Sequence, residues 1–468
     1  MSIKNDEKRP NIIFIMSDDH AAHAMSCYGS RINKTPNIDR IAEEGIRFDN
    51  CFCTNSICAP SRATILTGLY NHKNGVKTLR DDLDGRLENF PKVLQRSGYE
   101  TAIVGKWHLG HGDVHDPTGF DYWNVLPGQG NYFNPTFIEN GQEKQHEGYV
   151  TDITTDISID WLKNRSKEVA PFMLMCHHKA PHRPWLPDEK HADMYEDVDI
   201  PEPETFHDNY QNRSNAAKIA EMTVENHLTK KDYKIDPPEN LSPQELKSWK
   251  YQRYIKDYLR CVASIDDNVG RLLDYLDEAG LSEDTMIVYT SDQGFFLGDH
   301  GWYDKRFMYE ESLRMPFIVR YPRKIKPGSV TDAIAINVDF AETFIDYAGA
   351  SIPETMQGRS LLPIMEGETP EDWQTSMYYR YWMHMAQHAV TSHYGIRTER
   401  YKLIYYYGEA LDATGAIDDP QPPEWELFDL KKDPQELNNV YAHPRYQETV
   451  EALKTELYQI KEKVEDFD

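Results

Sequence analysis

Short apolar runs alternate with amphipathic segments from the start of the chain to about residue 350. Runs of this kind suit strands that are buried on both faces of a parallel sheet. They are Asn11–Met16, Thr101–Val104, Phe172–Met175, Met286–Thr290 and Phe317–Arg320. Between them, apolar positions at helical spacing predict helices at Asn37–Glu44, Thr151–Arg165 and within Leu246–Ala279. This order predicts an α/β fold with a large, mostly parallel central sheet flanked by helices.

The pattern changes after Pro370 to aromatic segments of alternating character, which are followed by one more helical segment. The predicted strands are Met377–Trp382, His393–Arg397, Tyr401–Tyr407 and Glu426–Leu430, and the predicted helix is Gln447–Val464. Adjacent strands with short connections favour an antiparallel sheet. We therefore expect two domains, residues 1–370 and a small C-terminal α+β subdomain at residues 371–468. The polar segment Glu202–Ser248 is expected to be an irregular surface segment near the functional site.

Charge and composition narrow the class of protein. Lys and Arg number 51 against 77 Asp and Glu, a net charge of −26 that disfavours nucleic acid and anionic membranes as partners. No apolar run approaches the roughly 20 residues that a membrane span needs. The six cysteines are too sparse for a disulfide scaffold, and Cys51 and Cys53 are interpreted as structural thiols. The first ten residues lack the apolar core of a signal peptide, so a cytoplasmic protein is expected, or a periplasmic or secreted one if a leader has been trimmed.

Reactive side chains follow four of the predicted strands. Asp18 and Asp19 follow the first strand, Lys106 and His108 the second, His182 the third and Asp292 the fourth. Ligands of such sheets gather at the carboxyl ends of the strands, so one crevice is expected to collect these groups.

The acids in this set, together with the amide of Gln293, indicate a metal site. Asp18, Asp19, Asp292 and Gln293 offer oxygen atoms without a set of thiolate or imidazole ligands. Such ligands suit a hard cation, Ca²⁺ or Mg²⁺, rather than zinc. Taken alone, adjacent acids at a strand end can also be helix caps or solvated loop residues.

The most specific motif is Cys58-Ala59-Pro60-Ser61-Arg62, which resembles the C-x-P-S-R motif of the type I, formylglycine-dependent sulfatases of the alkaline-phosphatase-like superfamily. Pro60 suits the first turn of a helix and would place residue 58 at a helix N-terminus, where an anion such as sulfate is favoured. The resemblance implies an alkaline-phosphatase-like sandwich fold, a formylglycine made from Cys58, and one calcium ion. It also implies that residue 58 joins the four oxygen ligands at the metal.

Three further motifs carry the same resemblance. Gly105–Gly110 is similar to the G-K-W-H-L-G element of the family, in which the lysine binds sulfate and the histidine lies beside the formylglycine. His182 fits the family's P-H-x-P context, although His177 and His178 are rivals by residue type. Lys305 matches the second sulfate-binding lysine. The catalytic set implied by the resemblance is Cys58, Arg62, Lys106, His108, His182 and Lys305.

The resemblance implies a sulfuric ester hydrolase. One hydroxyl of hydrated formylglycine would attack sulfur, and His182 would protonate the leaving oxygen. His108 would then accept a proton from the remaining hydroxyl, which expels sulfate and regenerates the aldehyde. The motifs do not identify the substrate, and they do not exclude other activities of the same superfamily. A sulfated monosaccharide or short oligosaccharide is expected, with aryl or choline sulfate, or a phosphate or phosphonate monoester, as alternatives. A sulfated-glycan binding protein with an unmodified Cys58 is the non-enzyme alternative. An oxidising enzyme, either a formylglycine-generating enzyme or an anaerobic maturase, is the implied protein partner.

Asp299, His300, Arg306, His384 and His388 are the candidate specificity residues.

Overall fold

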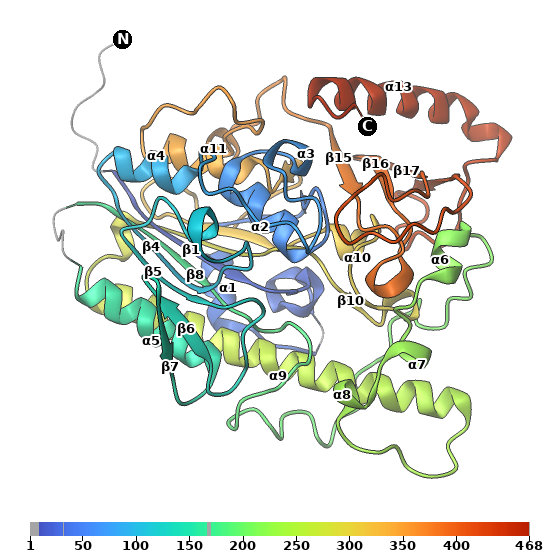
Figure 1. Ribbon diagram of the computed structural model, residues 1–468, viewed down its shortest axis with the longest axis horizontal. Helices are drawn as coiled ribbons and strands as arrows, with labels where there is room; N and C mark the ends of the chain where they lie inside the picture. Colours follow the sequence, from blue (N-terminus) through green and yellow to red (C-terminus); the bar gives the residue numbers. More distant parts are fainter. Residues whose placement is uncertain (1–8, 31, 166–169, 468) are drawn as a thin grey trace.

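The computed structural model describes residues 9–30, 32–165 and 170–467. A twisted central sheet lies between two groups of helices, and a smaller sheet with the C-terminal helix lies at one side of this body (Figure 1). Within the described part of the chain, no helix is both long and apolar enough to cross a membrane.

The central sheet has ten strands in the order β13-β2-β12-β9-β1-β8-β4-β5-β6-β7. Its middle, from β9 to β5, is parallel, whereas β12, β6 and β7 pair antiparallel with their neighbours. All five predicted strands belong to it. The bounds are β1 (Asn11–Ser17), β2 (Ile46–Phe48), β4 (Glu100–Lys106), β5 (Tyr122–Leu126), β6 (Thr136–Glu139), β7 (Gln142–Gln145), β8 (Phe172–His177), β9 (Thr285–Ser291), β12 (Phe317–Arg320) and β13 (Ser329–Thr331).

Strand β1 shows why the central runs are continuously apolar. Ile12 and Phe14 belong to one core cluster, and Ile13 and Ile15 to the other, because successive side chains point to opposite faces. The first cluster includes residues of α2 (Cys58–Thr67), α4 (Phe90–Arg96) and α11 (Asp339–Tyr347), and the second includes residues of α1 (Pro36–Glu43), α5 (Val150–Lys163) and α9 (Pro243–Glu278). Figure 1 shows α4 and α11 on one side of the sheet and α5 and α9 on the other.

The C-terminal segment forms a four-stranded antiparallel sheet, as expected. Its strands pair in chain order and are β15 (Ser376–Tyr381), β16 (His393–Thr398), β17 (Tyr401–Tyr406) and β18 (Glu424–Asp429). Helix α13 (Gln447–Lys463) contacts β15, β16 and β17. The fold class is therefore confirmed, while the domain boundary at residue 370 stays a prediction.

The segment predicted as an irregular excursion contains three short helices, α6 (Asn215–Ile219), α7 (Val224–His227) and α8 (Lys230–Tyr233). Helix α9 begins earlier than expected, because Ser242 and Glu245 form a capping box and Pro243 occupies the first turn. The remaining short elements are β3 (Cys51–Phe52), β10 (Phe296–Leu297), β11 (Tyr303–Asp304), β14 (Ala335–Ile336), α3 (Asn71–Asn74), α10 (Glu310–Leu313) and α12 (Leu362–Met365).

Candidate active site

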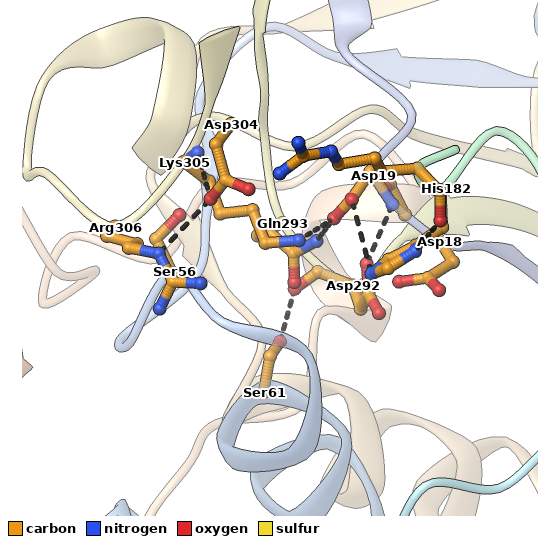
Figure 2. A network of polar contacts seen from close by, with 12 residues as sticks. Asp18, Asp19, Ser56, Ser61, His182, Asp292, Gln293, Asp304, Lys305 and Arg306 are labelled. Carbon is orange, nitrogen blue, oxygen red and sulfur yellow. Dashed lines mark hydrogen bonds and ion pairs between the residues drawn. The ribbon is translucent and has the colours of Figure 1, made fainter. Parts of the chain in front are cut away.

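The ends of two neighbouring strands bring the four predicted metal ligands together. β1 and β9 are parallel and in register at Ser17 and Ser291, so the residues that follow them emerge side by side. The backbone N–H of Asp19 donates to Oδ1 of Asp292 over 3.1 Å, and the amide of Gln293 donates to Asp19. Ligand atoms of Asp18, Asp19 and Asp292 lie within 4.8 Å of one another. Figure 2 shows the four side chains converging on one point.

Three cations surround these acids. Lys106, at the end of β4, pairs with Asp18, and Nζ of Lys305 lies 2.5 Å from Oδ1 of Asp19. Nε of Arg62 in α2 donates to Oδ2 of Asp292 over 3.0 Å, and Nη2 of Arg62 forms an ion pair with the same oxygen at 2.9 Å. All six side chains are at most 3% exposed. The predicted sulfate-binding cations and metal-binding acids therefore form one buried cluster of balanced charge.

The acids differ in how easily they ionise. Burial raises the pKa of Asp19 to about 7, and the carboxylates of Asp18, Asp292 and Asp304 add to the rise, although Lys305 opposes it. Burial likewise raises the pKa of Asp292 to about 6. Burial also opposes ionisation of Asp18, yet Lys106 leads the positive charges that hold its pKa well below the usual value. Burial therefore makes Asp19 and Asp292 harder to ionise than Asp18.

The cluster fits a hard divalent cation. Among the described residues, Oδ1 of Asp18 and Oε1 of Gln293 are buried oxygens without a hydrogen-bond partner. Buried acceptors of this kind are costly unless a ligand or ion satisfies them. The carboxylate and amide oxygens present are those that Ca²⁺ or Mg²⁺ prefers.

Cys58 is the first residue of α2, so the predicted helix N-terminus at this position is confirmed. Its side chain is 1% exposed, and its sulfur lies within 4.8 Å of ligand atoms of Asp18 and His182. Burial raises the pKa of the Cys58 thiol, with the charge of Asp18 as the next cause. A neutral thiol in this place is a poor nucleophile, which agrees with a requirement for modification. Cys51 and Cys53 are buried and free of disulfides.

The predicted histidines follow two strands that end at this edge of the sheet, His108 after β4 and His182 after β8. Nε2 of His182 lies 3.8 Å from Oδ2 of Asp19, and its Nδ1 donates to the carbonyl of Arg183 over 2.7 Å. His108 follows Lys106 and has positive φ, 60°, which is unusual outside glycine. The rival His177 contacts the carbonyl of Lys106 over 3.2 Å, whereas the ring of His178 lies 3.8 Å from the sulfur of Cys176, away from the acids.

A second group of polar side chains adjoins Lys305. Asp304 binds Nε of Arg306 over 3.2 Å and Nε2 of His388 over 3.3 Å, and Arg306 also donates to Gln387 over 3.0 Å. Asp304 and Arg306 both have positive φ, at 77° and 95°. Figure 2 shows Asp304 and Arg306 next to Lys305 on the far side from Asp18. Gln387 and His388 follow β15, so the C-terminal segment contributes to this group of polar side chains. We call Asp304, Arg306 and His388 the wall beside Lys305.

The other candidate specificity residues lie elsewhere. Asp299 pairs with His23 over 3.2 Å and lines a cavity of about 800 Å³ that contains none of the predicted catalytic residues. His300 is fully buried and contacts Asp208 over 3.1 Å. His384 contacts the carbonyl of Asp419 over 3.0 Å. Asp304 and Gln129 were missed. Asp304 belongs to the motif Gly301–Arg306, in which only Lys305 was assigned a role. Gln129, which contacts Lys106, stands outside every motif that indicated chemistry.

A parallel sheet with acids, cations and a helix N-terminus at its carboxyl edge is the arrangement that the motifs implied for an alkaline-phosphatase-like hydrolase. Comparisons with known proteins agree with this class. The Sulfatase family model matches residues 10–350, and the model of the N-sulphoglucosamine sulphohydrolase C-terminal region matches residues 298–463. The chain belongs to the sulfatase family and is a sulfuric ester hydrolase.

Individual relatives are similar over most of the chain. An N-acetylglucosamine-6-O-sulfatase of Bacteroides thetaiotaomicron is 45% identical, over 99% of this chain and 88% of its own length. The N-acetylglucosamine-6-sulfatase of Homo sapiens is 29% identical, over 80% of this chain and 67% of its own length. A solved structure described as a complex with its substrate, D-glucosamine-2-N,6-O-disulfate, is 45% identical with a TM-score of 0.92, covering 98% of this chain and 99% of that one.

Proposed function

We propose that this sulfatase hydrolyses the 6-O-sulfate ester of a glucosamine derivative. The observation that carries the proposal is the wall of Asp304, Arg306 and His388 directly beside Lys305. A carboxylate accepts hydrogen bonds from sugar hydroxyls and a guanidinium donates to them, so the pair can bind a sugar ring whose sulfate occupies the cationic cluster. The names of the two N-acetylglucosamine sulfatases and the substrate of the solved complex support this assignment.

We also propose that Cys58 is converted to formylglycine by a maturation enzyme, and that Asp18, Asp19, Asp292 and Gln293 hold Ca²⁺ together with residue 58. When present, formylglycine supplies the hydroxyl that attacks sulfur, and Ca²⁺ supplies positive charge beside that hydroxyl and the sulfate. The two partnerless oxygens of Asp18 and Gln293, and the closeness of Cys58 to Asp18, support this arrangement.

The chain's own cations would bind the sulfate group. Arg62, Lys106 and Lys305 are held at most 3% exposed and paired with acids. Held in a site from which water is excluded, they stabilise negative charge that develops on the sulfate oxygens without first having to reorganise. Because these cations are already held in place, they should stabilise the transition state more than the bound ground state.

His182 is suited to protonate the leaving sugar oxygen. The carbonyl of Arg183 can only accept, so Nδ1 of His182 carries a proton and Nε2 is the nitrogen that faces the acids. Burial holds the pKa of His182 well below its usual value, and Asp18 opposes this. A proton on Nε2 would be shared between the ring and the leaving sugar oxygen, whose basic alkoxide needs this proton to depart. His108 would accept a proton at position 58.

Sulfate release from matched sugars tests the proposal. The calcium-loaded protein is incubated with N-acetylglucosamine 6-sulfate, its C4 epimer N-acetylgalactosamine 6-sulfate, N-sulfated glucosamine 6-sulfate and 4-nitrophenyl sulfate. We expect kcat/KM for the first sugar to exceed that for its epimer by about 100-fold, because a lost hydroxyl contact leaves buried polar groups unpaired. Asp304→Asn should reduce this discrimination.

Cys58→Ala is the control for the chemistry, and it should remove turnover of every sulfate ester while leaving the fold intact. Mass spectrometry of the peptide that contains residue 58 establishes whether the preparation carries formylglycine. Hydrolysis of the aryl sulfate without hydrolysis of either glucosamine 6-sulfate would refute the proposed substrate class.

A further inference from the structure

A glutamine outside the predicted catalytic set contacts two of its members. Oε1 of Gln129 lies 2.6 Å from Nζ of Lys106, and Nε2 of Gln129 lies 3.3 Å from Nε2 of His108. One amide group thus connects the proposed sulfate-binding lysine to the proposed proton acceptor.

The backbone around Gln129 is arranged to present this side chain. β5 pairs in parallel with β4, and Leu126 is in register with Lys106, so the turn after β5 begins beside the end of β4. Gln129 stands between Gly128 and Gly130, which have φ of 54° and 65°, a region that glycine reaches without strain. A Cβ at Gly130 would lie 2.9 Å from a methyl carbon of Leu126. A side chain at this position would require Leu126 to move and would strain the backbone at its positive φ.

The same turn is tied to the rest of the site at its far end. The hydroxyl of Tyr132 donates to the carbonyl of His182 over 2.6 Å, and the backbone N–H of Val150 donates to the carbonyl of Tyr132 over 2.8 Å. Nζ of Lys179 lies 4.9 Å from the centre of the Tyr132 ring. Gln129 therefore projects from a turn that is held in place next to both proposed catalytic histidines.

The contacts of the amide determine its orientation. A lysine ammonium can only donate, so the amide oxygen must face Lys106 and the NH₂ group must face His108. An NH₂ group can only donate, so Nε2 of His108 accepts and carries no proton. The neutral ring then has its hydrogen on Nδ1. Burial, followed by the charge of Lys106, holds the pKa of His108 well below its usual value, which agrees with a neutral ring.

This tautomer places a lone pair where proton transfer needs one. At 3.3 Å the bond to Nε2 is near the long limit for hydrogen bonds, so a reacting hydroxyl can replace it. Among the described residues, Gln129 is the ring's one hydrogen-bond partner, and Nδ1 is buried without any. The orientation of His108 thus depends on Gln129.

We propose that Gln129 is a positioning residue that holds Lys106 by its amide oxygen and sets the tautomer of His108 by its amide nitrogen. This inference rests on the proposed roles of Lys106 and His108 in sulfate ester hydrolysis. It assigns a function to a residue that touches neither the acids nor Cys58 in this structure.

Two substitutions separate the two halves of the role. Gln129→Met keeps the length of the side chain and removes both bonds, so kcat/KM should fall about 10- to 100-fold, the usual cost of losing a residue that orients catalytic groups. Gln129→Glu can still accept from Lys106 but cannot donate to Nε2 of His108. We expect Gln129→Met to raise KM and lower kcat, whereas Gln129→Glu should keep KM near the wild-type value and lower only kcat. Gln142→Met, on the exposed strand β7, is the matched control and should change neither constant.

A double-mutant cycle distinguishes positioning from a general structural role. If Gln129 acts through His108, then Gln129→Met should cost less than about threefold in a His108→Ala background. Wild-type kinetics for Gln129→Met, or a loss of undiminished size in that background, would overturn the proposal. Retained activity in Lys106→Ala and His108→Ala would overturn both this inference and the proposed roles on which it rests.

The cycle is measured on 4-nitrophenyl sulfate as well as on N-acetylglucosamine 6-sulfate. If the sugar is not a substrate but the aryl sulfate is, the assignment of the substrate fails while the cycle on the aryl sulfate still decides the role of Gln129.

Discussion

Two buried clusters of charge in this protein solve the same physical problem differently. At the junction of the C-terminal sheet with the chain end, Arg380 pairs with Asp466, and both side chains are 1% exposed. Asp466 also accepts from the hydroxyl of Tyr378 over 2.5 Å, so both of its oxygens are bonded. The acids at the ends of β1 and β9 are equally buried, but oxygens of Asp18 and Gln293 have no partner within the described residues.

Asp466 and Asp19 ionise in opposite ways. The pKa of Asp466 is lowered, because Arg380 and Tyr378 outweigh the effect of burial. The pKa of Asp19 is raised to about 7 by burial and by neighbouring carboxylates. The carboxylate of the pair has both oxygens bonded within the protein, although Nε and Nη2 of Arg380 have no hydrogen-bond partner among the described residues. In the cluster at the sheet edge, by contrast, a carboxylate oxygen and an amide oxygen are left for a ligand to satisfy.

The largest expected effect comes from removing one acid of the incomplete cluster. Asp292→Asn should lower kcat/KM by about 10³-fold, because it weakens the proposed metal site and frees Arg62 from its partner. We expect calcium to raise the melting temperature of the wild-type protein, and Asp292→Asn should abolish this rise. Activity within tenfold of wild type, or an unchanged calcium response, would show that the cluster is complete without a metal.

The next effect concerns the complete pair. Asp466→Asn should lower the free energy of unfolding by about 3 kcal/mol at pH 7, because Arg380 is left buried without a counter-charge. Since the folded-state pKa of Asp466 is depressed, its contribution is present above the unfolded value of about 4 and is lost as the pH falls through the folded pKa.

Urea unfolding between pH 3 and pH 7 measures this difference, and kcat of the folded variant should stay within twofold of wild type. Asp372→Asn is the control, because Asp372 is 82% exposed and its pair with Arg359 should contribute nothing measurable. Equal losses in the two variants would remove the distinction between buried and surface pairs.

The smallest expected effect concerns the pH dependence of stability. A folded-state pKa of Asp19 raised to about 7 means that the stability of calcium-free wild-type protein declines as the pH rises from about 4 to 7. Asp19→Asn removes this group, so the decline should become smaller by about 1 kcal/mol, although the variant is less stable at every pH because buried Lys305 loses its partner. Urea unfolding in EGTA between pH 4 and pH 7.5 tests this, and an unchanged decline in the variant would contradict it.

The sequence predicted the interior of the fold better than its edges. The strands β1, β4, β8 and β9 are apolar on both sides, so their runs were visible without knowledge of their neighbours. The edge strand β7, Gln142–Gln145, is exposed at every position and has no apolar pattern to detect. Its place in the sheet is determined by its pairing with β6, which a single sequence does not show.

The same contrast holds within the site. Residues that follow predicted strands, such as Asp18 and Asp292, could be placed at one sheet edge by topology alone. Gln129, in the turn after β5, and Asp304, at the end of β11, could not be assigned roles. A single amide or acid near the end of a strand is common, and only its contacts in the structure indicate a function. Likewise Asp299 and Arg306 looked equivalent as candidates, and only the three-dimensional structure separates them.

The burial of Cys58 has a consequence for the order of events during synthesis. Its side chain is 1% exposed at the start of a helix whose ten residues are all buried. A second protein cannot reach this sulfur once the helix has packed against the sheet. Any enzymatic oxidation of Cys58 must therefore take place on the extended chain, which makes the time between translation and folding the period in which the protein either gains or permanently loses its proposed nucleophile.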